Sequence, residues 1–95
     1  MNGSCSMLRD TEGDRTVLRL SGVFDRDSAS ELCDLLARSA GEELVVDFSH
    51  VREFADLGVA VLARDLAGAE GRRLSLRGLR THQLRLFRYF GVEVH

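Results

Sequence analysis

The spacing of apolar residues changes in the middle of the chain. Residues 44–48 form a nearly unbroken apolar run of strand length, whereas after Asp56 the small and apolar residues recur every three or four positions, at Gly58, Leu62, Leu66 and Ala69. A solid apolar run followed by a period near 3.6 predicts a strand, a turn and a helix. Asp56 stands where the first N–H groups of that helix lack internal partners and attract an anion. We interpret this junction as the functional centre of the chain.

Short segments on both sides of the junction have the pattern of strands. Apolar and polar residues alternate at 16–21 and at 73–77, as in strands with one face on the core and the other face nearer to water. A turn at 12–14 precedes the first of these segments, and Gly22 is expected to end it. The strands are expected at residues 7–10, 16–21, 44–48, 73–77 and 92–94.

Three helices are predicted between the strands. Ser28 and Glu31 have the spacing of a capping box at the start of the first helix. The residues expected at the helix ends are Asp25–Ser28 and Gly41 for the first helix, Asp56 or Leu57 and Gly71 for the second, and Thr81 and Gly91 for the third. The residues expected to face the core are Ala29, Leu32, Leu35, Leu36, Val59, Leu62, Ala63, Leu66, Leu84, Phe87 and Phe90.

This order of elements predicts one α/β domain over residues 1–95. Each strand–helix–strand unit requires parallel neighbouring strands, whereas the first two strands can be antiparallel. The half-exposed strands place the helices mainly on one face of the sheet. We therefore expect a mixed sheet of four to five strands with three or more helices mainly on one face.

Composition and charge narrow the function. Apolar residues make up 44% and charged residues 29% of the chain, which is ordinary for a globular domain, and no apolar run approaches the ~20 residues that cross a bilayer. No signal-peptide pattern is present, so a cytoplasmic location without membrane insertion is expected. Residues 71–95 carry six arginines and one acidic residue, but the arginines are interleaved with core leucines and the net charge is −2. A partner-facing surface is therefore expected rather than nucleic-acid binding.

The chain has no pattern of an active site, so we expect no enzyme, no cofactor and no resident metal. His50, His82 and His95 are scattered, and none is spaced with Cys, Asp or Glu as in a zinc site. A response-regulator receiver domain is excluded because that fold needs a late lysine and this chain has none.

Acidic residues begin the first two helices at what should be the same edge of the sheet. These residues are Asp25, Asp27 and Asp56. Such a group of carboxylates could hold Mg²⁺ weakly, and it would serve equally well as an acidic rim for partner recognition.

The outer side of the second helix is less polar than a side facing water should be. Leu57, Val61, Arg64 and Gly68 lie on this side of a helical wheel. Two interpretations stay open: a second packing neighbour within the fold, or a small docking patch beside Asp56.

Four segments resemble the STAS domain of bacterial anti-sigma-factor antagonists, in the order and spacing of that family. They are Leu18-Arg-Leu-Ser-Gly-Val-Phe-Asp25, Leu44-Val-Val-Asp-Phe-Ser-His-Val51, Gly58-Val-Ala-Val-Leu62 and Leu86-Phe-Arg-Tyr-Phe-Gly91. The resemblance covers nearly the whole chain. In the family, Asp-Ser-Ser-Gly or Asp-Thr-Ala-Gly opens the second helix, and its first hydroxyl is phosphorylated by a kinase that is also the anti-sigma factor.

The resemblance aligns the segment 55–58, Ala-Asp-Leu-Gly, with that motif. Asp56 then stands at the phosphoacceptor position, and Ala55 replaces the usual aspartate. An aspartate cannot accept phosphate from a serine kinase, so the ordinary switch is absent or altered. We expect Asp56 to cap the helix in any case. Its charge could also imitate the roughly −1.5 to −2 of phosphoserine, but loss or replacement of the switch is favoured because Ala55 has changed as well.

The resemblance implies a non-enzymatic regulator that binds an anti-sigma kinase or a related signalling protein. The residues expected to contact this partner are Asp25, Asp27, Ser28, Asp56, Leu57, Val61 and Arg64. Similar domains also serve as cytoplasmic accessory subunits of ABC-type lipid or anion transporters, which is the alternative function. The identity of the partner, the regulated process and the oligomeric state stay open.

Overall fold

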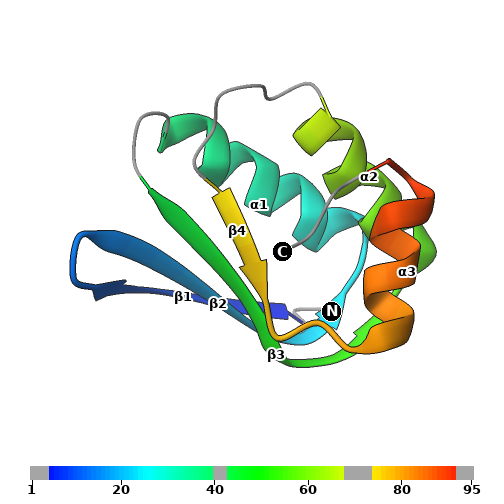
Figure 1. Cartoon of the computed structure of the whole chain (residues 1–95), viewed down its shortest axis with the longest axis horizontal. Helices are drawn as coiled ribbons and strands as arrows, with labels where there is room; N and C mark the ends of the chain where they lie inside the picture. The colour runs from blue at the N-terminus through cyan, green and yellow to red at the C-terminus, as the bar shows by residue number, and fades with distance from the viewer. Residues whose placement is uncertain (1–4, 40–42, 68–73, 92–95) are drawn as a thin grey trace.

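The computed structural model describes residues 5–39, 43–67 and 74–91, which form four strands and three helices (Figure 1). The elements are β1 (Cys5–Glu12), β2 (Arg15–Phe24), α1 (Arg26–Arg38), β3 (Leu44–Phe54), α2 (Asp56–Ala67), β4 (Leu74–Arg77) and α3 (Thr81–Tyr89). This order confirms the predicted alternation up to the third helix. The predicted last strand at 92–94 lies outside the described residues, as do Gly41, Gly68 and Gly71.

The strands form one mixed sheet in the order β1-β2-β3-β4. β1 pairs antiparallel with β2, whereas β2, β3 and β4 run parallel to one another. Because β3 lies inside the sheet, every residue from 44 to 48 is buried, as its unbroken apolar pattern predicts. The predicted fold class, a mixed sheet with three helices, is confirmed.

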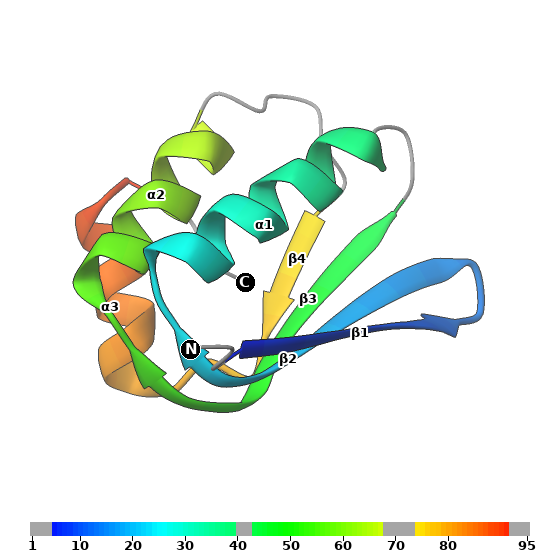
Figure 2. The same ribbon diagram turned by 180° about the vertical axis from the view of Figure 1, so that it is seen from behind.

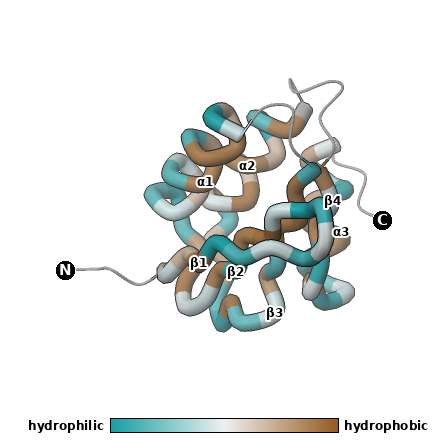
Figure 3. The backbone as a smooth tube through the Cα atoms, turned by 90° about the vertical axis from the view of Figure 1, so that its left-hand side faces the viewer, coloured by the Kyte–Doolittle hydropathy of each residue, from teal (hydrophilic) through white to brown (hydrophobic). Residues whose placement is uncertain are grey.

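The helices are arranged in one layer on the sheet. α1 and α2 lie together over one face of the curved sheet, and α3 lies beside α2 (Figures 1 and 2). Hydrophobic and hydrophilic stretches alternate along the helices (Figure 3), as expected for helices that bury one side and leave the other in water. The core therefore fills the space between this helical layer and the sheet.

Aromatic rings occupy the centre of this core. The rings of Phe24 and Phe48 meet edge to face with their centroids 5.4 Å apart, and Phe87 of α3 lies 6.1 Å from Phe48. Most residues predicted to face the core are buried, and three are half-buried: Leu35, Leu66 and Leu84. The prediction for Phe90 is wrong, because this residue follows the last turn of α3 and is 37% exposed.

Three strands are longer than predicted. β1 spans Cys5–Glu12 instead of 7–10, so it includes Glu12, the first residue of the predicted turn. β2 continues through Gly22 to Phe24 instead of ending at Gly22, and β3 continues to Phe54. Gly22 has φ +96, and the pairing of β2 with β3 shifts register on both sides of it. A glycine with positive φ lets the strand bend at an irregularity without ending.

The predicted caps of the first and third helices are displaced. The residue that caps α1 is Asp25 and not Ser28. Ser28 is the third residue of the helix and forms the capping box with Asp25. In α3 the flanking residue is Arg80, whose backbone N–H donates to Gln83 Oε1 at 2.7 Å. Thr81 is therefore the first residue of the helix and not its cap. Gly91 follows α3 with φ +90, as expected for a glycine that ends a helix.

Charged side chains cover the face of the sheet that carries no helix. Val17 and Val45 pair with each other on this face and are 0% and 2% exposed. The pattern of residues 16–21 predicts that this side of the strand is nearer to water, and this prediction is wrong at Val17. We call the covering group the sheet-face ion chain. It consists of Asp10, Glu12, Arg19, Asp47 and Arg77. Their charged ends pair with one another across the strands, on the same face as the two buried valines.

Candidate functional site

The predicted junction between a strand and a helix is present, and Asp56 is the first residue of α2. The carbonyl of Ala55 accepts hydrogen bonds from the N–H groups of Gly58 (2.9 Å) and Val59 (3.2 Å). Ala55 is thus the flanking residue, and the prediction that Asp56 caps the helix is wrong. The exposed Asp56 side chain still lies in the first turn, where the helix dipole favours a negative charge.

The starts of α1 and α2 are in direct backbone contact. The N–H of Ala55 donates to the carbonyl of Phe24 at 2.9 Å, which joins the ends of β3 and β2. A Cβ atom on Gly58 would lie 2.7 Å from the carbonyl oxygen of Asp25, a distance that no side chain at this position could keep. Glycine at position 58 therefore allows the first turn of α2 to rest on the residue that caps α1.

Asp25 is held as a carboxylate by the first turn of α1. Its Oδ1 accepts from the backbone N–H of Ser28 at 3.0 Å and from the Ser28 hydroxyl at 2.8 Å. These two hydrogen bonds hold the pKa of Asp25 below its usual value. Ser28 itself is 3% exposed, so the prediction that it contacts a partner is wrong. Its hydroxyl positions the Asp25 loop instead.

The residues on the outer side of α2 are not all in the same environment, so neither of the two interpretations applies to the whole side. Val61 is half-buried and packs against the core, as expected for a second packing neighbour. Leu57 is 65% exposed immediately beside Asp56, and Arg64 is exposed further along the helix. An exposed leucine therefore stands next to an exposed carboxylate at the start of α2, and the docking-patch interpretation stays a prediction for this part of the helix.

The acidic residues at the helix starts do not form a metal site. In the part of the chain that the structure describes, no group of three or more His, Cys, Asp or Glu side chains is placed to hold a metal ion. The carboxylates of Asp25, Asp27 and Asp56 are therefore not gathered into such a group. Asp27 is exposed and lies 4.0 Å from Arg26. Within the described ranges, no helix has the length and apolar character needed to cross a membrane.

Two exposed residues were not recognised from the sequence. Leu8 on β1 is 68% exposed, and Tyr89 at the end of α3 is 83% exposed, with its ring against that of Phe90. The i, i+4 spacing of Arg85 and Tyr89, on the side of α3 opposite Phe87, could have identified Tyr89 as exposed. Nothing in the local pattern identifies Leu8, because its exposure depends on the order of the strands.

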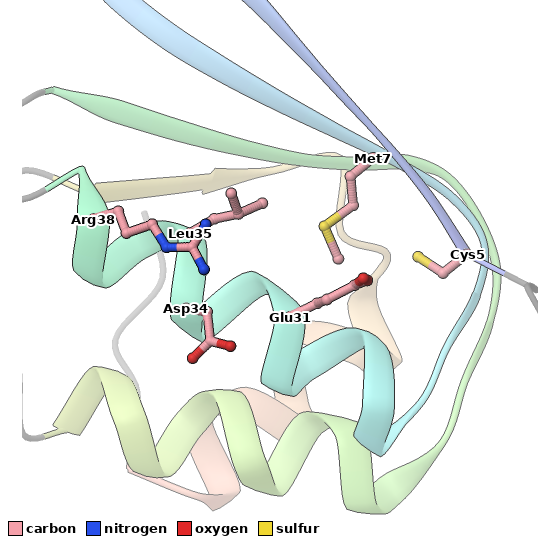
Figure 4. A pocket seen from close by; sticks show the side chains of 6 residues that line it. All are labelled: Cys5, Met7, Glu31, Asp34, Leu35 and Arg38. Carbon is pink, nitrogen blue, oxygen red and sulfur yellow. The ribbon is translucent and has the colours of Figure 1, made fainter.

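A groove lies between β1 and α1. None of the residues that line it belongs to the junction between β3 and α2. It has a volume of about 410 Å³ and is lined by Cys5, Met7, Glu31, Asp34, Leu35 and Arg38 (Figure 4). Burial raises the pKa of the Cys5 thiol, so this thiol stays protonated at neutral pH. The groove combines sulfur and leucine side chains with two carboxylates and one guanidinium.

Comparison with known proteins identifies the family. The family model described as "Mlab, STAS domain" matches residues 7–94. None of the curated proteins matches the chain in sequence.

Solved structures share the fold. An anti-sigma factor antagonist from Mycobacterium paratuberculosis is 22% identical, with a TM-score of 0.66 over 94% of this chain and 82% of that one. The STAS domain of an antisigma-factor antagonist from Rhodobacter sphaeroides is 16% identical, with a TM-score of 0.62 over 82% and 90%. The antagonist SpoIIAA in its unphosphorylated form is 15% identical, with a TM-score of 0.62 over 90% and 81%. The chain belongs to the STAS domain family.

Proposed function

We propose that this chain is a non-enzymatic, cytoplasmic regulator that resembles an anti-sigma-factor antagonist and binds an anti-sigma kinase or a related signalling protein. Its family and the antagonists that share its fold support this class of function. The contact surface is formed by the start of α2 and the loop before α1. The residues of this surface are Asp25, Asp27, Asp56, Leu57, Arg64 and the exposed part of Val61.

One observation carries the proposal: Leu57 is 65% exposed at the start of a helix whose backbone is fixed against Asp25. Full burial of a leucine side chain contributes about 1.5–3 kcal/mol. If a partner covers Leu57, this residue alone accounts for roughly one to two orders of magnitude in affinity. The exposed carboxylates around it then select a partner with basic residues at the rim of its surface.

The resemblance to the family places Asp56 where a phosphorylated hydroxyl residue is expected. SpoIIAA, which shares the fold, was solved in its unphosphorylated form. Asp56 carries a permanent charge that a kinase cannot add or remove. We propose that the switch was lost or replaced in this chain and that partner binding does not depend on phosphorylation at position 56. The change of the preceding aspartate to Ala55 supports loss over mimicry.

The test compares two leucines of similar exposure on different elements. Leu57→Glu is expected to weaken binding of a purified anti-sigma kinase about tenfold or more in calorimetry, with no change in the thermal unfolding midpoint. Leu8→Glu, at 68% exposure on β1, is the matched control and should bind the kinase like the wild type. Equal binding by wild type and Leu57→Glu would place the docking surface elsewhere.

The second candidate is a cytoplasmic accessory subunit of an ABC-type lipid or anion transporter. The matching family model is described as "Mlab, STAS domain". Because this description does not name a sigma-factor regulator, we keep the transporter subunit as a candidate. Affinity purification with the tagged chain distinguishes the two. Recovery of an ATPase or a membrane transporter, lost with Leu57→Glu and without any kinase-like protein, would replace the first candidate by the second.

A further inference from the structure

The outer edge of β1 has no partner among the strands that the structure describes. Among the described strands, β1 pairs with β2 only, along its full length from Cys5 to Glu12. No described strand therefore pairs with the backbone N–H and C=O groups along its other edge. Long edge strands with exposed apolar residues are templates for pairing with another strand. Leu8, near the middle of β1, is 68% exposed.

The two faces of β1 offer different contacts along this edge. Cys5 and Met7 pair with Gly22 and Leu20 on the face toward the helices, and both side chains line the groove between β1 and α1 (Figure 4). Leu8 points to the opposite face, because successive side chains of a strand alternate. A strand added to this edge would place half of its side chains at the mouth of the groove and the other half beside Leu8.

We propose that this strand is β1 of a second copy of the chain, paired antiparallel about a twofold axis at Leu8. The two sheets then join into one sheet that continues across both chains. This interface goes beyond the proposed function and uses none of the residues assigned to the kinase surface. A symmetric dimer is also the commonest oligomer, since one self-complementary surface is sufficient to form it.

The residue pattern of β1 selects this register. Residues directly opposite each other in an antiparallel pair share a face, so the twofold axis must pass through a residue. An axis at Leu8 places Leu8 against its own copy and Ser6 against Asp10. An axis at Arg9 would place two guanidinium groups opposite each other and Leu8 against Asp10, and both arrangements are unfavourable. An axis at Met7 would leave Leu8 opposite Ser6.

Charge complementarity on the helix face supports the same register. With the axis at Leu8, Arg9 of the second copy lies opposite Met7, at the mouth of the groove. Glu31 and Asp34 line this groove with Arg38 as the one basic residue, so the groove has a net charge of −1. Arg9 is exposed, and its five N–H donors allow it to pair with these carboxylates in addition to contacts within its own chain. By symmetry the interface contains this ion pair twice.

Sedimentation equilibrium of the full chain over a range of concentrations tests the proposal. The wild type is expected to dimerise, and Leu8→Glu and Arg9→Glu should each raise the dimer dissociation constant about tenfold or more. The double variant Arg9→Glu with Glu31→Arg exchanges the charges across the interface and should restore dimerisation. Arg85→Glu, a charge reversal on the exposed side of α3, is the matched control and should dimerise like the wild type.

A wild-type chain that is monomeric at all concentrations would overturn the proposal, and so would a dimer that survives both Leu8→Glu and Arg9→Glu. Failure of the charge exchange to restore the dimer would overturn the assigned register. Leu57→Glu should leave the dimer intact, and Leu8→Glu should leave kinase binding intact, so failure of this interface and failure of the proposed function are separate results.

Discussion

Arg77 at one edge of the sheet binds Glu12 at the other edge, although β2 and β3 lie between their strands. Nη1 of Arg77 donates to Oε1 of Glu12 at 3.1 Å, and Nη2 donates to Oε2 at 2.9 Å. The pair passes over the row formed by Val17 and Val45, as the strand register places it. Nε of Arg77 also donates to Oδ2 of Asp47 at 3.3 Å. One guanidinium group therefore connects three strands and completes the sheet-face ion chain.

The first prediction concerns acid stability. The hydrogen bond from Arg77 lowers the pKa of Glu12. Burial alone would raise the pKa of Asp47, but hydrogen bonds from Ser49 and Arg77 lower it below its usual value. A carboxyl group whose pKa falls on folding stabilises the folded state above its unfolded pKa, and this contribution is lost as the pH falls through its folded pKa.

Stability should therefore decrease as the pH is lowered below about 4, the usual range of carboxyl groups. Urea unfolding between pH 7 and pH 3 measures this effect. Glu12→Gln should be less stable than the wild type at pH 7, and the difference should shrink toward pH 3. A difference that is independent of pH would mean that the Glu12 charge does not stabilise the fold.

The second prediction tests the geometry of the guanidinium. Arg77→Lys keeps the charge but cannot form two parallel hydrogen bonds to Glu12 while binding Asp47. We expect a lower thermal unfolding midpoint for this variant. Arg80→Lys is the control, because Arg80 is exposed just before α3, and its effect should stay within about 0.5 kcal/mol. Equal midpoints for the two variants would show that any cation suffices at position 77.

The third prediction concerns the contact between the helix starts. Gly58→Ala introduces a Cβ atom 2.7 Å from the carbonyl oxygen of Asp25, so the two backbones must separate. We expect a loss of about 1–3 kcal/mol in the free energy of unfolding, measured by urea denaturation. Ser30→Ala on the exposed side of α1 is the control and should change stability little. A neutral Gly58→Ala variant would mean that the two helices do not need this close approach.

The fourth prediction concerns the position of the switch. Asp56→Ser restores a hydroxyl in the first turn of α2, where the side chain is exposed. A kinase that binds the wild type should then phosphorylate Ser at this position, as measured by mass spectrometry. Asp56→Ala, which has no hydroxyl, should remain unmodified there. If a kinase shown to bind adds no phosphate to the serine variant, Asp56 does not occupy the phosphoacceptor position.

The elements of the fold were predictable because the signals are local. The change of period around Asp56 identifies β3 and α2 from about twenty neighbouring residues, and the expected core leucines follow from it. Helix starts were less predictable, since several polar residues before a helix can cap it. Asp25, Ser28 and Thr81 all belong to capping types, and only the backbone conformation decides which residue flanks the helix.

Other errors come from contacts between distant parts of the chain. Val17 and Val45 are buried by side chains from β1 and β4, and the residues of the pair Glu12–Arg77 are 65 positions apart. The alternation of apolar and polar residues along one strand cannot predict that side chains of other strands bury these valines. The exposure of Leu8 likewise follows from the position of β1 at the edge of the sheet, which depends on the pairing of all four strands.

The contact of Gly58 with Asp25 has a consequence for binding. Because the first turn of α2 rests on the backbone of Asp25, and Ala55 is hydrogen-bonded to Phe24, neither helix start can shift alone. The end of the molecule that carries Leu57 is therefore a preorganised platform. A partner that docks there loses little conformational entropy on the side of this chain, so more of the contact energy remains as affinity.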